Sequence, residues 1–179
     1  MAIEPGAPRQ TDHLAAWLIV PLVALLAIIL IVFYGLFNTT TVDGESMLPT
    51  LRPADRVLFT KSYSRPVRGD IVVIHLLDEQ RQPHDIVKRV VAVPGDTIEI
   101  RNDIAWVNGS REATHGVILD PSVAVSIPSQ RIPDGNVFVM GDNRPVSLDS
   151  RFIGLIPLPD VQGEVAAVFA PITRMRLVN

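Results

Sequence analysis

The N-terminal part of the chain contains one long apolar run without a formal charge, residues 14–37. As a helix rising 1.5 Å per residue, the run would measure about 36 Å, enough to cross a hydrocarbon core of about 30 Å. Trp17 and Tyr34 stand near its two ends, where membrane helices often carry interfacial aromatic residues. The pattern predicts a polar tail over residues 1–13 and a single transmembrane anchor helix over 14–37.

Two other structures would give a similar pattern. A buried core helix is disfavoured because the run has no polar face. A cleavable signal peptide usually has a shorter apolar region followed by a small-x-small site, whereas Asn38-Thr39-Thr40-Thr41 follows here. The tail does not indicate an orientation, since Arg9 and the amino terminus are offset by Glu4 and Asp12.

After residue 38 the pattern changes to short apolar runs and alternations typical of β-strands. Strands are expected at 57–59, 70–76, 85–93, 97–100, 104–107, 123–132, 136–140 and 165–169. No sustained helical period follows the anchor, and 142 residues can bury a core. We therefore predict a mostly β domain over residues 38–179, with a loop-rich region near 110–122.

Composition excludes several classes of protein. The net charge of -3 and the scattered arginines argue against nucleic acid as a partner. The absence of cysteine excludes disulfides, thiolate zinc sites and a cysteine nucleophile. No cofactor or metal site is predicted.

The segment that follows the anchor, residues 42–51 (VDGESMLPTL), contains a candidate nucleophile, Ser46. A serine hydroxyl needs a neutral base to take its proton. The Gly-x-Ser-x-Gly turn of other serine hydrolases is incomplete, because Leu48 replaces its second glycine. Histidine is one possible base, and the positions of all four histidines are more typical of tail, strand-end or loop residues: His13, His75, His84 and His115.

Lysine is the other possible base, and the chain has two lysines beside 14 arginines, which stay protonated in proteins. In the strand expected at 85–93, alternation places Lys88 on one face with Ile86, Val90 and Ala92. Such surroundings lower the pKa of an ammonium group by desolvation. An edge strand on which Lys88 extends to water remains an alternative. Lys61, in a polar run, is more typical of a solvated loop.

A third polar segment follows the strand expected at 136–140 and is rich in Asx, Arg and Ser residues, which form rigid turns. It is either a hydrated surface loop or a supporting shell for the site. Asp149 would pair with Arg151, and Asp142 would pair with Arg89 or Arg144.

Three separated segments resemble the boxes of bacterial type I signal peptidases, in that family's order and behind an anchor. They are Gly44-x-Ser46-Met47-x-Pro49-Thr50, then Gly69-Asp70-Ile71-Val72 with Lys88-Arg89-Val90-x-x-x-Pro94-Gly95-Asp96, and finally Gly141-Asp142-Asn143-Arg144-x-x-Ser147-x-Asp149-Ser150-Arg151-x-x-Gly154. The resemblance covers nearly all of residues 38–170.

The resemblance implies a signal-peptidase-like β-fold and a membrane-bound serine endopeptidase with a Ser–Lys dyad. Ser46 would attack the scissile carbonyl, and neutral Lys88 would act as general base. Ser147 would hydrogen-bond the Lys88 amine. Supporting residues around the site would be Asp142, Arg144, Asp149 and Arg151.

The oxyanion would be met by the Ser46 N–H and by a second donor two residues earlier. Some family members carry a serine hydroxyl there, but this chain has Gly44, so a backbone group is expected instead. With 52 residues between Lys88 and Gly141, the extra subdomain of longer members is expected to be absent or reduced to a small flap.

The resemblance further implies signal peptides of secreted preproteins as substrates, cut after small-x-small sites. It also implies a single-pass protein of the cell membrane, in contact with the lipid bilayer, with its catalytic domain on the extracytoplasmic side. Nine residues lead from Phe37 to Ser46, a reach of at most about 30 Å, so the serine would lie near the bilayer.

Two other functions remain open. A self-cleaving repressor-type peptidase also uses a Ser–Lys dyad, but it would carry a helix-turn-helix and an Ala-Gly cleavage site, and this chain has no Ala-Gly dipeptide. A catalytically silent, membrane-tethered β-domain that binds extended peptides would show no turnover and would not need a lysine at position 88.

Overall fold

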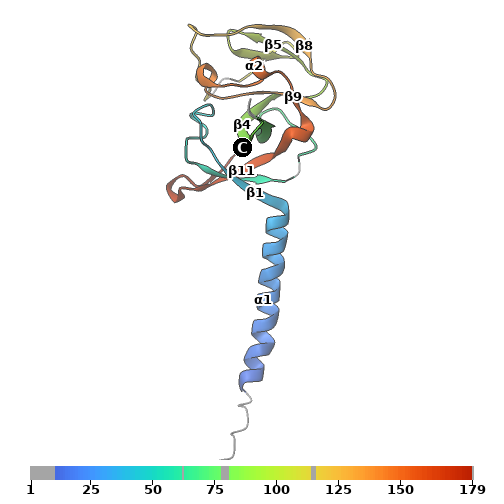
Figure 1. The fold of residues 1–179 in the computed structure, drawn as a ribbon, viewed down its shortest axis with the longest axis vertical. Helices are drawn as coiled ribbons and strands as arrows, with labels where there is room; N and C mark the ends of the chain where they lie inside the picture. The colour runs from blue at the N-terminus through green and yellow to red at the C-terminus, as the bar shows by residue number, and fades with distance from the viewer. Residues whose placement is uncertain (1–10, 62, 78–80, 114–115, 179) are drawn as a thin grey trace, which may run out of the picture. The chain divides into compact units, whose positions relative to one another are not determined.

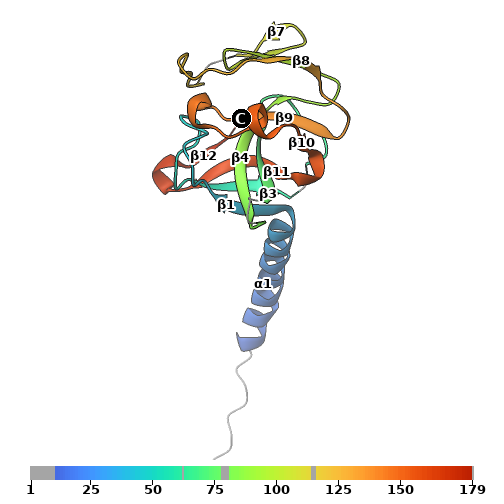
Figure 2. The same cartoon turned by 45° about the horizontal axis from the view of Figure 1, so that its top comes forward.

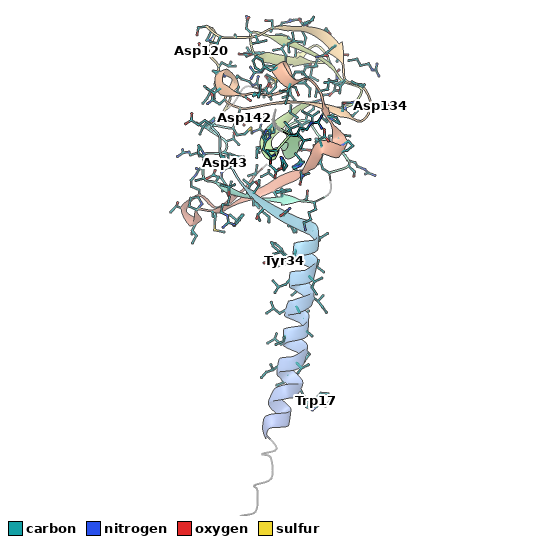
Figure 3. The ribbon with its side chains drawn as sticks, in the orientation of Figure 1. Trp17, Tyr34, Asp43, Asp120, Asp134 and Asp142 are labelled. Carbon is teal, nitrogen blue, oxygen red and sulfur yellow. The ribbon has the colours of Figure 1, made fainter. Side chains whose placement is uncertain are left out.

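The structure is a computed structural model that describes residues 11–61, 63–77, 81–113 and 116–178. The chain divides into two compact units, Met1–Leu36 and Phe37–Asn179. The first unit contains helix α1, Thr11–Leu36, which begins three residues before the expected anchor and ends one residue before its expected end. Its part from Trp17 to Leu36 is long and apolar enough to cross a membrane, with a mean hydropathy of 2.9. Trp17 and Tyr34 project near the two ends of this part (Figure 3).

The second unit is built mainly from short strands. They are β1 (Phe37–Thr41), β2 (Arg56–Thr60), β3 (Ile71–Leu77), β4 (Pro83–Ala92), β5 (Thr97–Arg101), β6 (Ile104–Val107), β7 (Ser110–Arg111), β8 (Ile127–Arg131), β9 (Asn136–Met140), β10 (Ile156–Pro157), β11 (Val161–Ala170) and β12 (Arg176–Leu177). Helical turns are η1 (Arg144–Val146), α2 (Ser150–Ile153), η2 (Leu158–Asp160) and η3 (Ile172–Arg174). The prediction of a mostly β fold behind one apolar helix is confirmed.

An antiparallel sheet with the order β1-β2-β11-β3-β4-β9-β10 forms the body of this unit, and β12 pairs with β11 (Figure 1). Strand β11, near the C-terminus, lies between β2 and β3. This close packing requires Gly163, because a Cβ there would lie 1.4 Å from the Thr60 carbonyl oxygen. The two strand pairs that flank the site, β1–β2 and β3–β4, are therefore joined through β11.

A second antiparallel sheet, with the order β7-β6-β5-β8, lies beyond β9 and away from β1 (Figure 2). Tight turns with positive φ connect its strands: Asn102 and Asp103 between β5 and β6, and Asn108 and Gly109 between β6 and β7. Both are the left-handed conformations that short hairpins favour. This sheet and its turns occupy much of the chain between Lys88 and Gly141.

Three apolar clusters hold the two sheets. One face of the large sheet packs against the segment after β1, through residues that include Met47, Leu51 and Phe59. The opposite face buries Val72, Ile74 and others with the turn around β10. The third cluster fills the space between the sheets, with Ile98 and Ile100 from the four-stranded sheet packed with residues of β4 and β9.

The described part of the structure contains four short strands where none is predicted, β1, β7, β10 and β12, and two predicted strands have clearly different bounds. β1 begins at the last residue of the predicted anchor, and its Asn-Thr-Thr-Thr sequence lacks apolar alternation. The strand expected at 123–132 is limited to β8, whose residues are mostly exposed. The strand expected at 165–169 begins four residues earlier, at Val161.

Candidate active site

Ser46 lies in a series of turns between β1 and β2. The side chains on either side of it in the segment are anchored: Val42 is 4% exposed, Met47 1% and Leu51 0%, all in the cluster beneath the large sheet. Burial of these apolar side chains fixes the backbone, while Ser46 itself remains partly accessible. The local sequence therefore presents a hydroxyl on a rigid turn.

Lys88 lies in the middle of β4 and is 4% exposed. Its Nζ is hydrogen-bonded to Ser46 Oγ at 2.7 Å. The alternative in which Lys88 extends to water is wrong, because its side chain is buried although no described strand pairs with the second edge of β4 at this residue. Two residues separated by 42 positions are thus brought into direct contact.

Burial lowers the pKa of Lys88 from its ordinary value of 10.5 to about 8. Desolvation is the main cause, the nearby Asp149 carboxylate acts in the opposite direction, and the Arg151 guanidinium lowers the pKa further. A substantial fraction of the Lys88 amine is therefore neutral near pH 8, and a neutral amine can accept the proton of a hydroxyl.

The histidines do not form such a contact within the described part of the chain. His75 Nδ1 lies 2.8 Å from Asp85 Oδ1 near the end of the β3–β4 hairpin, and His84 is exposed on β4. His115 lies outside the described residues, as does the side chain of His13. Among described side chains, the hydrogen bond to Ser46 Oγ comes from Lys88.

The segment after β9 packs directly against the backbone of the serine turn. The Asn143 N–H donates to the Ser46 carbonyl at 2.9 Å, and Asn143 Nδ2 donates to the Glu45 carbonyl at 3.2 Å. Gly141 is required at this contact: a Cβ there would lie 2.3 Å from Ser147 Oγ and 2.5 Å from the Ser46 carbonyl oxygen. Sequence reasoning quoted Asn143 as part of a motif but assigned it no role.

Ser147 is buried, 4% exposed, beside Gly141. The expected hydrogen bond between Ser147 and the Lys88 amine is not formed among the described residues. The Ser147 hydroxyl instead lies close enough to the Asp149 carboxylate to help lower the pKa of that group. The hydroxyl is close to the site, but it does not orient Lys88 in this structure.

The charged supporting residues form two groups. In the first, Arg89 Nη2 lies 2.6 Å from Asp142 Oδ2, which also accepts a hydrogen bond from Thr50 Oγ1 at 2.5 Å. Of the two partners expected for Asp142, the structure selects Arg89. Arg144 instead pairs with Glu112, at 2.6 Å.

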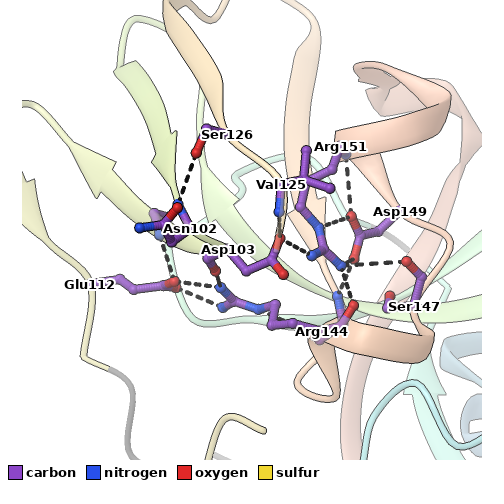
Figure 4. Close-up of polar contacts among 11 residues, drawn as sticks. Asn102, Asp103, Glu112, Val125, Ser126, Arg144, Ser147, Asp149 and Arg151 are labelled. Carbon is purple, nitrogen blue, oxygen red and sulfur yellow. Dashed lines mark hydrogen bonds and ion pairs between the residues drawn. The ribbon is translucent and has the colours of Figure 1, made fainter. Parts of the chain in front are cut away.

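In the second group, Arg151 pairs with Asp149 at 2.8 Å, as expected, and also with Asp103 at 2.6 Å (Figure 4). Burial opposes ionisation of Asp149, but its hydrogen bonds to Arg151 and the charge of Arg151 hold the pKa of that carboxyl below its ordinary value. The sequence did not indicate a role for Asp103 or Glu112. Asp103 lies in the turn between β5 and β6, and Glu112 directly follows the two-residue strand β7, so neither belongs to a recognisable motif.

A cavity of about 740 Å³ opens beside the Ser46–Lys88 pair. Its walls are residues 41–47, the ends of the β3–β4 hairpin and three partly or fully exposed apolar side chains, Val146, Leu148 and Ile153. β4 pairs with β9 only from Arg89 onward, so no described strand covers the second edge of β4 ahead of Arg89. An open strand edge next to a nucleophile can receive an extended peptide.

Gly44 lines the same cavity and is exposed. A Cβ at Gly44 would meet nothing nearer than the Ser46 amide nitrogen, 4.0 Å away. The space next to Gly44 is therefore free of other described atoms near the Ser46 N–H, the group expected to bind an oxyanion. Among the described residues, no cluster of three or more His, Cys, Asp or Glu side chains is arranged to hold a metal ion.

Comparisons with known proteins identify the family of the chain. Residues 14–170 match the family model for signal peptidase, peptidase S26. The chain is 36% identical over 182 residues to signal peptidase I P of Bacillus subtilis subsp. natto, covering 94% of this chain and 95% of that protein. It is 37% identical over 163 residues to a probable signal peptidase I-1 of Synechocystis, covering 86% of this chain and 81% of the relative.

Among solved structures, a signal peptidase I from Enterococcus faecalis matches with 28% identity and a TM-score of 0.45, over 57% of this chain and 98% of that chain. The family model spans most of the sequence, and both relatives are matched over more than four fifths of their length. The chain therefore belongs to the signal peptidase family, peptidase S26, and is a serine endopeptidase of the signal peptidase I type.

Proposed function

We propose that this signal peptidase is anchored in the membrane by α1 and cleaves preproteins after small-x-small sites, with Ser46 as nucleophile and Lys88 as general base. The 2.7 Å contact between Lys88 Nζ and Ser46 Oγ carries the proposal. A lysine buried at this distance has a lowered pKa and can take a proton from the hydroxyl.

In the first step, neutral Lys88 accepts the Ser46 proton while Oγ attacks the scissile carbonyl carbon. The new C–O bond leaves a negative charge on the carbonyl oxygen. The resulting Lys88 ammonium then donates its proton to the departing amine, which leaves an ester on Ser46. In the second step, Lys88 takes a proton from a water molecule whose oxygen attacks the ester carbonyl carbon. The bond between this carbon and Ser46 Oγ then breaks, and the Lys88 ammonium returns the proton to Oγ, which releases the acid product and restores the free enzyme.

The developing oxyanion would be stabilised by the Ser46 N–H and by a backbone group at Gly44. The open space at Gly44, where a Cβ would meet no atom closer than 4.0 Å, supports access of a substrate carbonyl. Ser147, buried next to Gly141, is proposed to accept or donate a hydrogen bond to the Lys88 amine once substrate is bound. Asp142, Arg144, Asp149 and Arg151 would support this geometry.

The substrate would add as an extended strand along the uncovered edge of β4 ahead of Arg89. Successive side chains of a strand point to opposite faces, so two residues separated by one share a face. A small-x-small sequence would thus turn two small side chains towards the enzyme, beside the reacting bond. The exposed apolar residues Val146, Leu148 and Ile153 would contact the rest of the signal peptide.

The anchor would limit cleavage to bonds near the bilayer. Ten residues lead from Leu36 to Ser46, a reach of at most about 35 Å when extended. The apolar part of α1, Trp17–Leu36, has the length and composition of a span. We place the catalytic domain on the extracytoplasmic side, where the cleavage site of an exported chain emerges.

The test uses full-length protein in detergent with a preprotein and with a fluorogenic small-x-small peptide. Ser46→Ala is expected to lose turnover, whereas Ser110→Ala, at an exposed position of β7, is expected to retain it. Lys88→Arg keeps the charge but supplies no base, so it is also expected to be inactive beside an active Lys61→Arg control. Turnover by Ser46→Ala at the wild-type rate would exclude this nucleophile, and activity of Lys88→Arg would point to a histidine base.

A further inference from the structure

A buried ionic network connects the four-stranded sheet to the segment that packs against Ser46 (Figure 4). Two arginines form its centre, and the side chain of each is 1% exposed. Arg144 donates to both carboxylate oxygens of Glu112, at 2.6 and 2.9 Å, and to the backbone carbonyl of Asp103. On its other side, Arg144 Nε donates to the Gly141 carbonyl at 2.9 Å.

Arg151 makes a parallel connection. It donates to Asp103 Oδ1 at 2.6 Å on the side of the four-stranded sheet. It also donates to both oxygens of Asp149, at 2.9 and 2.8 Å, and to the Arg144 carbonyl at 2.8 Å. Each arginine therefore joins a carboxylate of the four-stranded sheet to the backbone of the segment that contains Gly141 and Ser147.

The same segment determines where the reacting groups lie. Its Gly141 N–H donates to Asp149 at 2.9 Å, and its Asn143 holds the Ser46 carbonyl. Asp149 and Arg151 are also the charges that act on Lys88. A displacement of either arginine would move the backbone under Ser46 and change the electrostatic field at Lys88.

Fold stability alone does not account for such a network. Burying several charges is costly, and buried ion pairs replaced by packed apolar side chains are often neutral or stabilising. The space between the sheets already has its own apolar cluster, with Ile98, Ile100 and Phe138 each 1% exposed. What the ionic contacts add is a fixed geometry for the two arginines.

We propose that Asp103 and Glu112 are positioning residues of the peptidase reaction, which act through Arg151 and Arg144 on the segment that holds Ser46 and Lys88. The four-stranded sheet is then a part of the catalytic apparatus. This inference rests on the proposed roles of Ser46 and Lys88. It adds two residues that contact neither substrate nor the reacting atoms.

The test compares Asp103→Asn and Glu112→Gln with Glu99→Gln in full-length enzyme. Glu99 is the matched control, because it lies on the same sheet and pairs with Arg101 at 2.7 Å at the solvent-accessible surface. Both network variants are expected to lose about tenfold or more in kcat while KM changes less than about twofold. Glu99→Gln is expected to match the wild type in both constants.

A pH profile separates positioning from simple loss of stability. Asp103→Asn removes a negative charge behind Arg151, so the apparent pKa of kcat/KM is expected to fall by about half a unit or more. Unfolding of part of the sample would reduce the amplitude of the profile and leave its midpoint unchanged. A normal kcat and an unchanged midpoint in both network variants would overturn the inference.

If the charge-neutral variants do not fold, Glu112→Asp provides the second test. It keeps the charge and withdraws the carboxylate by about 1.5 Å, roughly one bond length along the side chain. A lower kcat at an unchanged melting temperature would support the inference, and a wild-type kcat would refute it. Activity in Ser46→Ala would refute the proposed function itself. If Ser46→Ala is inactive and the network variants behave like the wild type, only the positioning role is refuted.

Discussion

The protonation of Lys88 should control the rate of the enzyme across the neutral and alkaline range. Burial lowers the pKa of this lysine to about 8. At pH 7 about one Lys88 amine in ten is then neutral, compared with about three in ten thousand for a lysine with the ordinary value, a ratio of about 300. The geometry of β4 thus determines how much active base exists at neutral pH.

We expect kcat/KM for a small-x-small peptide to rise about tenfold per pH unit below pH 8 and to level off above it. The measurement runs from pH 6 to 10 in detergent, with Lys61→Arg as the control that should give the same profile. The chain has two lysines. NMR of 13C-labelled lysine should therefore give two signals, and Lys88→Arg assigns the one that titrates near pH 8.

Two outcomes would refute this reasoning. A profile that is flat from pH 6 to 10, or that levels off near the ordinary pKa of histidine, about 6.5, would mean that Lys88 is not the base. A rise that continues beyond pH 10 would mean that the buried environment does not lower the pKa of this lysine in the working enzyme.

Four substitutions give further tests. Lys88→Met should raise the free energy of unfolding at pH 7 by about 3 kcal/mol, because the lowered pKa of Lys88, about 8, means that the folded state disfavours the charged lysine. This gain is complete below pH 8 and disappears as the pH rises towards 10.5. Denaturant titrations at pH 7 and pH 10 would measure the difference. Gly141→Ala should reduce kcat/KM about 100-fold, since the new methyl group would clash with Ser147 Oγ. Gly44→Ala should keep most of the activity, because a methyl group there has room. Equal losses in the two variants would contradict this reasoning. Gly163→Ala should prevent stable folding, because its Cβ would lie 1.4 Å from a backbone carbonyl of β2, and a wild-type melting temperature would contradict it.

The sequence predicted those residues of the candidate site whose side-chain chemistry contrasts with the apolar pattern around them. Ser46 follows an apolar run and Lys88 is a rare lysine within an apolar strand, so each stands out from its surroundings. The Asp149–Arg151 pair could also be predicted, because the two oppositely charged residues are only two positions apart in the sequence. Strand alternation also predicted most of the β structure, although β1 was missed because four of its five residues are polar, Asn38 and three threonines, and leave no apolar alternation.

The remaining parts of the site depend on contacts between distant segments. Nothing near Glu112 indicates that it lies beside Arg144, 32 positions away, because the contact follows from how the two sheets pack. The partner of Asp142 was similarly open, since Arg89 and Arg144 are both suitable cations. The sequence also predicts a contact between the Ser147 hydroxyl and Lys88, whereas in the structure this hydroxyl packs against Gly141.

The position of β11 also has a consequence for the order in which the enzyme matures. The turn with Ser46 belongs to the β1–β2 side of the sheet and Lys88 to the β3–β4 side, and β11 lies between them. Because β11 is Val161–Ala170, ribosomes make it after both of these strand pairs. Long-range pairing of this kind forms late in folding. In a nascent chain that stops before residue 170, the strand pair next to Ser46 and the strand pair with Lys88 are therefore not yet joined through β11, and we expect such a chain to show no proteolysis.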